Sequence, residues 1–418
     1  MHASIPLPAH SNVAALAERA VTSATRAAMQ ASGIDADVRI DPERVAVAYT
    51  SDRWLRVSGG PPPGFAPLSG FFRAADGWVR THANYPHHRA ALLRGLALPA
   101  TSDPADVRAA LATRSVQSTV AAVSTAGGLC VPVRAGDPVI DAAWREGPLV
   151  GYRRLGDAAR LPRRMISPEA PLRGIRVLDL TRVIAGPIAT RTLGFLGADV
   201  LRIDPPHLPE LPAQHLDTGH GKRSALLDAT TARGAGTIAD LVRGADVVAL
   251  GYRPAALARL GLSPSALARL RPGVVVLQLS AWGEPGRRGF DSLVQAESGI
   301  ALAEGAHGEP GALPAQALDH SAGYLLAAAA MDLLARRDRE GGSWLAETSL
   351  RRIAAELAGL PRRIEPLADI RRADPEPHLQ DFDVAGVPVR TAGPAVLYPG
   401  GPIAFAPPRP WGGDDPQW

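Results

Sequence analysis

The sequence predicts an α/β protein, with an open parallel sheet covered by helices on both faces and a smaller α+β domain beside it. Two observations support this fold class. From Gly174 onward, short apolar runs alternate with longer segments of helical periodicity, a pattern typical of parallel sheets. Earlier in the chain, FFRAADGWVRTHA (71–83) contains two alternating apolar runs around Asp76-Gly77, which is a hairpin signal.

The regular half of the chain reads strand by strand. Its first unit, DLTRVIAGPIATRTLGFLGADVLRIDPP (179–206), is strand, tight turn, helix and strand, with Pro187 suited to the first turn of the helix. We expect strands at 175–181, 199–204, 224–229, 246–252 and 274–283, and helices at 187–198, 232–245 and 254–272. This alternation makes the sheet Rossmann-like, and ligands of such sheets bind beyond the carboxyl ends of the strands. The site is therefore expected at 181–187, 204–207, 251–253 and 280–283.

The first half is less regular. We expect a helix at 12–33, a short strand at RVAVAYT (44–50) and a Gly/Pro-rich loop at 58–70. The polar, proline-bearing segment 163–174 is the best candidate for a linker.

Composition narrows the class of protein. Of 418 residues, 46% are hydrophobic and 21% charged, which is ordinary for a globular protein. The net charge of +4 comes from evenly spread arginines, so no nucleic-acid surface is expected. No apolar run reaches the ~20 residues of a membrane span, and no signal peptide is recognised. Cys130 is the sole cysteine, so an internal disulfide is excluded, and His87 and His88 lack the spaced partners of a metal site. A cytoplasmic protein without a metal is expected.

A dinucleotide site would require G-x-G-x-x-G after the first strand and an acid about 20 residues later. Asp204 supplies the acid, but the turn has a single glycine, and Pro187 removes one N–H that a pyrophosphate would use. An NAD(P)-binding oxidoreductase stays open as an alternative.

Five ordered elements resemble the class III CoA-transferases, the family of formyl-CoA:oxalate and carnitine-type CoA-transferases and α-methylacyl-CoA racemase. The first is PLRGIRVLDLTRVIAGPIATRTLGFLGADVLRIDPP (171–206). The others are GHGKRSALLD (219–228), ADVVALGYRPAALARLGL (245–262), GFDSLVQAESG (289–299) and ALDHSAGYLLAAAAMDLLARRDREG (317–341).

The resemblance implies that Asp319 is the nucleophile. In this family an aspartate attacks the acyl-CoA thioester, forms an acyl-aspartyl anhydride and then an aspartyl-CoA thioester. An ordinary Asp pKa of about 3.9 would leave this group ionised at neutral pH. Asp319 is also a good N-cap, which is the structural alternative. Leu318 replaces a frequent glycine, His320 either tunes Asp319 or faces solvent, and Phe290 stands where the racemases have a histidine, so racemisation is not expected.

The resemblance also implies a site for coenzyme A. Backbone of the first turn would line the adenine or pantetheine, a tyrosine would pack on adenine, and arginines would meet phosphates; ordinary packing and solvated helix faces are the alternatives. Pro205 stands where the family often has a phosphate-binding arginine, so that contact is either lost or supplied by Arg202. Lys222, the sole lysine, is expected in ion pairs near the site. The implied CoA contacts are Val183, Ile184, Ala185, Leu227, Gly251, Tyr252, Arg259 and Arg288.

The order of segments differs from the family. Residues 71–83 and GGLCVPVRAGDPVIDAAWREG (127–147) resemble small-domain segments that normally follow the sheet. We therefore expect a rearranged chain: a small-domain-like, incomplete first copy at 1–165, a Rossmann-like catalytic domain at 171–370 and a C-terminal extension at 371–418. The resemblance implies a homodimeric transferase that moves CoA between an acyl-CoA and a carboxylic acid. A non-catalytic CoA-binding relative is the alternative, and the acyl group is not readable from the sequence.

Overall fold

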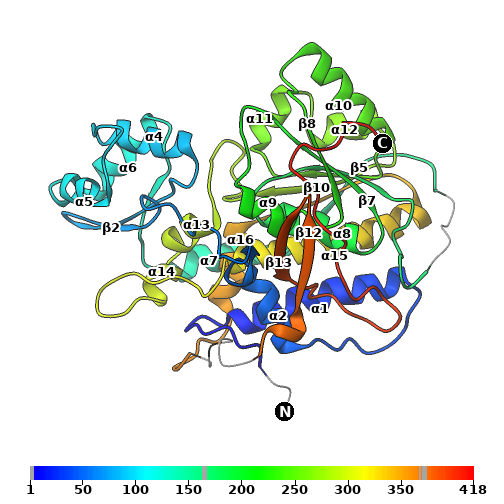
Figure 1. Cartoon of the computed structure of the whole chain (residues 1–418), viewed down its shortest axis with the longest axis horizontal. Coiled ribbons are helices and arrows are strands. Elements are labelled where there is room, and N and C mark those ends of the chain that lie inside the picture. Colours follow the sequence, from blue (N-terminus) through cyan, green and yellow to red (C-terminus); the bar gives the residue numbers. More distant parts are fainter. Residues whose placement is uncertain (1–3, 162–166, 367–368, 370–373) are drawn as a thin grey trace.

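The computed structural model describes residues 4–161, 167–366, 369 and 374–418. In this part of the chain, seven strands form one sheet in the order β5-β11-β10-β9-β6-β7-β8 (Figure 1). β5 lies antiparallel at one edge, and the others are parallel. From β8 to β11 the parallel strands follow the doubly wound order 3-2-1-4-5-6, and the predicted fold class is confirmed. The strands are β5 (Gly151–Gly156), β6 (Arg176–Leu180), β7 (Asp199–Asp204), β8 (Lys222–Leu226), β9 (Val247–Leu250), β10 (Val275–Ser280) and β11 (Ser343–Ser349).

Helices cover both faces of this sheet because successive strand residues point to opposite sides. Val177 and Val247 belong to one core with α8 and α15, while Leu178 and Val248 belong to a second core with α10, α11 and α12. Both faces are therefore buried, as parallel sheets require. The helices are α8 (Ala185–Phe195), α10 (Ala232–Gly244), α11 (Pro254–Arg259), α12 (Pro264–Leu270), α15 (Ala317–Glu340) and α16 (Leu350–Gly359).

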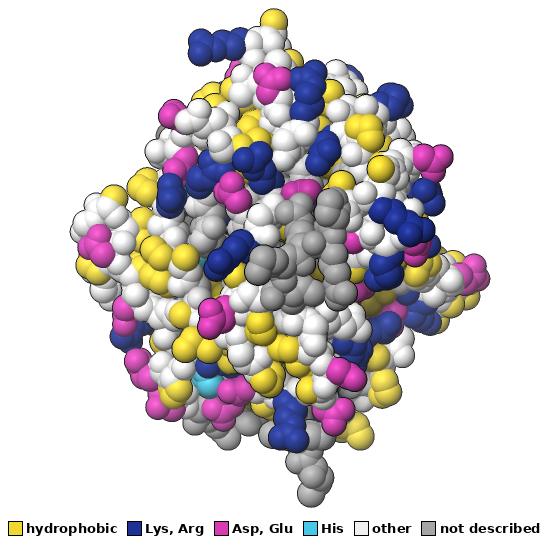
Figure 2. All heavy atoms as spheres, turned by 90° about the vertical axis from the view of Figure 1, so that its right-hand side faces the viewer, with side chains coloured by type: hydrophobic (Ala, Val, Ile, Leu, Met, Phe, Trp, Pro, Cys, Tyr) yellow, Lys and Arg dark blue, Asp and Glu magenta, His cyan; other side chains and the backbone are white. Residues whose placement is uncertain are grey.

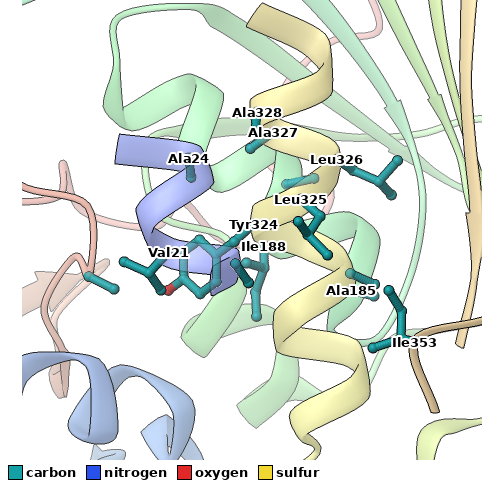
Figure 3. Packing of buried hydrophobic residues seen from close by; sticks show 14 of the residues in the cluster. Val21, Ala24, Ala185, Ile188, Tyr324, Leu325, Leu326, Ala327, Ala328 and Ile353 are labelled. Atoms are coloured by element: carbon teal, nitrogen blue, oxygen red, sulfur yellow. The ribbon is translucent and has the colours of Figure 1, made fainter. Parts of the chain in front are cut away.

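The N-terminal helix α1 (Val13–Ala31) packs on this same body. Figure 3 shows Val21 and Ala24 of α1 beside Tyr324 of α15 and Ile188 of α8. Small residues allow close packing here: a Cβ added at Gly323 would lie 2.7 Å from the Ala185 carbonyl oxygen. Through α1 and β5, the first 165 residues share a core and a sheet with the later half.

A smaller unit projects from this body (Figure 1). Its three-stranded sheet has the order β2-β3-β4 and a separate apolar core that includes Phe72, Val79 and Leu92. The 71–83 hairpin is confirmed, with Ala74 paired to Gly77 across a two-residue turn. The elements are β2 (Phe71–Ala74), β3 (Gly77–Thr81), β4 (Cys130–Pro132), α4 (Pro86–Gly95), α5 (Pro104–Ala112) and α6 (Val116–Thr125). The connecting helices are α7 (Pro138–Glu146), α13 (Asp291–Glu297) and α14 (Ile300–Ala303).

The last residues return to the body. A β12–β13 hairpin pairs with β1 (Arg56–Val57), and Trp418 donates a hydrogen bond from Nε1 to the Leu241 carbonyl oxygen at 2.8 Å. The Gly412 N–H donates to Ser224 Oγ, and the Ser224 N–H donates to Asp414 Oδ2, so the C-terminal segment lies along the edge strand β8 of the main sheet. The remaining elements are α2 (Pro42–Tyr49), α3 (Ser51–Trp54), α9 (Pro212–Thr218), the 3-10 turn η2 (Glu376–His378), β12 (Leu379–Val384) and β13 (Val387–Ala392).

The strand predicted at 44–50 is wrong, since this segment is helix α2. Asp41 caps it, because its Oδ1 accepts hydrogen bonds from the N–H groups of Glu43 and Arg44, and Pro42 occupies the first turn. Residues 45–49 are all buried, so the segment lacks the alternation of apolar and polar residues that marks a half-buried strand. The predicted strand 224–229 lies at 222–226. The first part of the predicted linker 163–174, residues 163–166, lies outside the described residues.

The molecular surface is mixed in charge. On the face shown in Figure 2, basic side chains are interspersed with acidic ones. Among the described helices, none is both long and apolar enough to cross a bilayer.

Candidate active site

Asp319 lies in the first turn of α15 and is buried, with 6% of its surface exposed. The helix begins at Ala317, with Gln316 in the capping position, so the interpretation of Asp319 as an N-cap is wrong. Among the described residues, none donates a hydrogen bond to the Asp319 carboxylate. The carboxylate is thus unpaired in the part of the chain that the structure describes.

A second carboxylate touches the same helix start. Asp291, the first residue of α13, is fully buried, and its Oδ2 accepts a hydrogen bond from the Asp319 N–H at 2.9 Å. The Gln295 side chain donates to the other oxygen of Asp291, and Gln295 Oε1 accepts from the Leu313 N–H at 2.9 Å. This network holds Asp291 in place directly beneath Asp319.

Burial and mutual repulsion raise the pKa of both carboxylates. Burial raises the pKa of Asp291 to about 6 against the hydrogen bonds that it accepts. Burial, and then the charge of Asp291, raise the pKa of Asp319 well above its usual range. Two carboxylates this close cannot both ionise readily. The expectation of an ordinary pKa for Asp319 is therefore wrong.

The pair makes folding stability depend on pH. Both groups bind protons more tightly when folded, so the stabilisation is complete below about pH 4 and is lost as pH rises through 6 and beyond. We expect Asp319→Asn to flatten this loss of stability between pH 5 and 8, because one of the two groups with a raised pKa is then absent. Urea unfolding at several pH values measures it, with the exposed Asp240→Asn as control. Parallel pH profiles for Asp319→Asn and wild type would contradict the prediction.

The turn after β6 is held by a buried ion pair. Lys222 Nζ on β8 lies 3.0 Å from Asp179 Oδ2 and donates to the Pro187 carbonyl oxygen at 2.8 Å. Thr181 and Thr190 hydroxyls also donate to Asp179. Burial lowers the pKa of Lys222 to about 8, partly offset by Asp179. The expected ion pair of the sole lysine is confirmed, and it ties two strands to the start of α8.

The three residues predicted to contact CoA through their backbone, 183–185, lie in the turn after β6 and at the start of α8. Val183 has a positive φ of 69°, and its N–H donates to Glu210 Oε2 at 3.1 Å. Ile184 precedes α8, and Ala185 is buried at its first residue. One N–H of the turn is thus already satisfied by a carboxylate of the protein.

Arg202 cannot replace the phosphate contact missing at Pro205. Its side chain is fully buried, with Nε 2.7 Å from Asp204 Oδ2 and Nη2 2.9 Å from Glu210 Oε2. Glu210 also accepts from the Tyr85 hydroxyl at 2.6 Å. Against the effect of burial, Arg202 and then Arg182 lower the pKa of Glu210 to about 2. The charges of this cluster neutralise one another. The expectation that Arg202 supplies the missing phosphate contact is therefore wrong.

A basic cluster lies at the carboxyl ends of the strands, where β6 and β9 are neighbours. Burial lowers the pKa of Arg288, and repulsion by Arg253, which follows β9, lowers it further. Burial also lowers the pKa of His87 and of His88, and repulsion by Arg182 and Arg288 lowers both further. These groups therefore lie near one another at the switch point of the sheet, where ligands of doubly wound folds bind. The sequence analysis named Arg288 as a CoA contact but missed Arg182 and Arg253. Both could have been found, because each follows the end of a parallel strand, where ligands of such sheets bind.

The other predicted contacts divide into two groups. Tyr252 is half-buried near Arg182 and Asp204, its hydroxyl has no partner among the described residues, and Leu227 packs in the same core. Gly251 is exposed beside them. Arg259, in contrast, is exposed at the end of α11 and forms no ion pair with the described residues.

His320 is buried against the Tyr49 ring, with 5.1 Å between the ring centroids, so the interpretation that it faces solvent is wrong.

The smaller unit closes one side of the site. The His82 ring stacks on Phe290 with centroids 3.7 Å apart, and Arg288 Nη2 donates to the Gly127 carbonyl oxygen at 2.7 Å. Among the described residues, no group of histidine, cysteine or acidic side chains is arranged to hold a metal ion.

The sequence model of one family, CoA-transferase family III, matches residues 172–361, a range that contains Asp291, Asp319 and the basic cluster. Residues 172–361 belong to CoA-transferase family III. The match begins at Leu172, so the rearranged order of the preceding segments stays a prediction.

Similar proteins carry transferase names. A probable fatty acyl-CoA transferase of Mycobacterium tuberculosis is 32% identical over 209 residues, 46% of this chain and 53% of that protein. Succinyl-CoA:glutarate CoA-transferase of Mus musculus is 29% identical over 31% of this chain and 34% of its own. A crystal structure of a hypothetical M. tuberculosis protein has 31% identity and a TM-score of 0.43, covering 46% of this chain and 57% of that one. This chain thus spans about half or less of the length of these family III relatives.

Proposed function

We propose that this protein transfers CoA from an acyl-CoA thioester to a free carboxylic acid, with Asp319 as the nucleophile. The observation that supports it is the unpaired, buried Asp319 carboxylate within a domain of CoA-transferase family III. The relatives' names, a fatty acyl-CoA transferase and a succinyl-CoA:glutarate CoA-transferase, agree with this reaction class.

The chemistry follows in two exchanges. The Asp319 carboxylate attacks the thioester carbonyl, which expels CoA thiolate and leaves an acyl-aspartyl anhydride. The thiolate then attacks the aspartyl carbonyl, releases the first acid and forms an aspartyl-CoA thioester, and the acceptor acid reverses both steps. Because burial raises the pKa of Asp319, the ionised form is a poorly solvated, reactive nucleophile once its proton has left. Asp291 beneath it serves to raise that reactivity and to anchor the helix start.

Coenzyme A would lie along the switch point. Its phosphates would meet Arg182, Arg253 and Arg288, with the adenine near Tyr252 and Leu227 and the pantetheine passing the 183–185 turn towards Asp319. Arginine suits phosphate because its fork of N–H donors matches the oxygens. The exposed Arg259 would have at most a peripheral role.

Removal of one cluster arginine is expected to weaken CoA binding. Arg253→Gln and Arg288→Gln should each raise the Kd of CoA about 10- to 100-fold, as one lost hydrogen-bonded charge contact is worth about 1.5–3 kcal/mol. Isothermal titration calorimetry measures this, with the exposed Arg233→Gln on α10 as matched control. Unchanged CoA affinity in both cluster variants, or tighter binding of NADP⁺ than of CoA, would contradict the placement; the latter result would favour the oxidoreductase.

The reaction itself is tested by incubation with a panel of acyl-CoAs and free acids. Exchanged thioesters, and a CoA adduct on Asp319 detected by mass spectrometry and released by hydroxylamine, are expected. CoA binding without exchange or adduct would instead support a non-catalytic CoA-binding relative, which the burial of Asp319 leaves as the second candidate.

The rest of the assembly belongs to the same proposal. Residues 1–165 would supply in cis the small-domain part of the site, 171–370 the catalytic domain and 371–418 an extension that packs back on it. Contact of His82 with Phe290 and of Tyr85 with Glu210 supports the first of these roles. A cytoplasmic homodimer without a metal is part of the proposal, and sedimentation velocity tests the dimer.

A further inference from the structure

The smaller unit has an open sheet edge. β2 is the edge strand in the order β2-β3-β4, so its outer side has no neighbouring strand among the described residues (Figure 1). Ala74 pairs with Gly77 across the two-residue turn, and such a turn closes on a hydrogen-bonded pair. Because bonded and non-bonded pairs alternate along an antiparallel ladder, the backbone groups of Phe71 and Arg73 point outward.

These outward backbone groups are unpaired within the described part of the chain. At the turn end of the edge, the Ala75 N–H donates to the Arg114 carbonyl oxygen at 2.9 Å. Before that point, neither the N–H nor the carbonyl oxygen of Phe71 or Arg73 bonds to a described residue outside the β2–β3 ladder. The edge therefore offers the N–H and the carbonyl oxygen of both residues to a further strand.

This edge lines a pocket of about 750 Å³, within the range of about 300–1,000 Å³ that is usual for ligand sites. Five successive residues, 71–75, take part in its lining. Helix α5 forms one wall, on the side of Phe72, because Val107 and Leu111 of this helix share a core with Phe72. The remaining lining residues are Trp78, Arg108, Ala112, Glu309 and Pro310.

The two faces of the edge strand each carry an arginine at the pocket. Arg73 lies on the same face as its cross-strand partner Trp78, and its guanidinium carbon lies 5.6 Å from the centroid of the Trp78 ring. Arg108 lies on the other face, on α5. Neither arginine forms an ion pair with a described residue, and Glu309 is the one acidic side chain among the lining residues. The pocket is therefore positive on both sides of the open edge.

We propose that this edge binds an extended acidic segment of another protein as a fourth strand of the smaller sheet. The backbone of the segment bonds to Phe71 and Arg73, as in other cases of strand addition. Neighbouring residues of a strand point to opposite faces, so two successive acidic side chains reach Arg73 and Arg108. Guanidinium groups pair well with carboxylates, and apolar residues of the segment cover Phe71 and Trp78.

The charge of the edge favours a partner over a second copy of the chain. Antiparallel pairing of β2 with the β2 of another copy would bring two Arg73 side chains together, and like charges on paired strands are destabilising. An acidic segment supplies the opposite charge instead. The edge lies outside the residues assigned to CoA and acyl transfer, so this binding goes beyond the proposed function and does not depend on it.

Fluorescence anisotropy with two labelled peptides tests the choice of partner. The peptides are Thr-Val-Glu-Glu-Val-Thr and Thr-Val-Lys-Lys-Val-Thr, each titrated with the full chain in the absence of CoA. We expect wild type to bind the glutamate peptide at least tenfold more tightly than the lysine peptide. Arg108→Gln should reduce this preference at least threefold, and the exposed Arg94→Gln of the same unit should leave it unchanged. Equal affinities for the two peptides in wild type, or no effect of Arg108→Gln, would overturn the proposal.

A proline at position 73 separates backbone pairing from charge. Arg73→Gln removes the cation and keeps the outward N–H, whereas Arg73→Pro removes both. An edge strand accepts a proline whose N–H would face outward, and thermal melts establish that both variants are folded. We expect Arg73→Pro to bind the glutamate peptide at least fivefold more weakly than Arg73→Gln does. Equal affinities would show that the arginines alone hold the peptide and would overturn strand addition.

Sedimentation velocity examines the other occupant. We expect Arg73→Pro and wild type to have the same oligomeric state without peptide. Self-association of wild type that Arg73→Pro abolishes would identify a second copy at this edge and overturn the proposal. Because neither experiment uses CoA or turnover, their results stand apart from the fate of the transferase function.

Discussion

Replacement of Asp319 by Asn is expected to abolish CoA exchange. The proposed reaction passes through a covalent bond to this carboxylate, and an amide cannot form the anhydride. We expect the rate to fall at least about 10³-fold, as is usual when a covalent nucleophile is removed. The CoA adduct and its hydroxylamine product should also disappear, while calorimetric CoA affinity should stay within about threefold of wild type.

The matched control lies on the same helix. Asp332 of α15 is an exposed aspartate whose carboxylate accepts a hydrogen bond from the Tyr152 hydroxyl at 3.2 Å. Asp332→Asn should retain full exchange activity. If Asp319→Asn keeps more than a tenth of the wild-type rate in the presence of normal folding, another group must be the nucleophile.

Replacement of Lys222 by Met is expected to have the largest effect on stability. The change leaves Asp179, which is fully buried, without the cation that lies 3.0 Å from its Oδ2. Removing one partner of a buried ion pair typically lowers the free energy of unfolding by about 3–5 kcal/mol. The β6 turn should loosen as well, because Lys222 also holds the Pro187 carbonyl oxygen at the start of α8. Urea unfolding and CoA titration together measure both effects.

The next residue supplies the control. Arg223 pairs with Asp199 at 2.8 Å, but this pair is partly exposed, with 22% and 42% of the side chains accessible. Arg223→Met should therefore lower the free energy of unfolding by about 1 kcal/mol or less. The double variant Lys222→Met, Asp179→Asn should recover part of the loss, since no uncompensated charge remains. Equal effects of Lys222→Met and Arg223→Met would show that burial of the pair is unimportant.

Periodicity predicted the large sheet well and the N-terminal region less well. Runs such as DVLRID at β7 are buried on both faces and bounded by turn residues, and that pattern is typical of parallel strands. RVAVAYT has the same apolar character, yet it forms α2 because Asp41 caps it, Pro42 occupies its first turn and its residues 45–49 are buried in the main core. A short, fully buried apolar run carries no period that separates a strand from a helix.

The site shows a similar division. Asp319, Lys222 and the residues after the strands could be named because their positions follow the chain order of the sheet and the family motifs. The Asp291–Asp319 contact, the raised pKa of that pair and the neutralisation of Arg202 by Glu210 depend on burial and on distances across the fold. His82 lies 208 positions before Phe290, and the two rings stack only because β3 packs against α13.

The sequence by itself determined the order of strands and helices along the chain from residue 174 onward, and the match of residues 172–361 to CoA-transferase family III. These properties follow from local periodicity and from short motifs, which act between neighbours in the chain. Only the tertiary structure decided which charges are paired, which carboxylates have a raised pKa, and that His82 of the first half stacks on Phe290 beside Asp291. The physical reason is that desolvation and Coulomb interactions depend on separation in space, and the chain brings these groups together only when it folds.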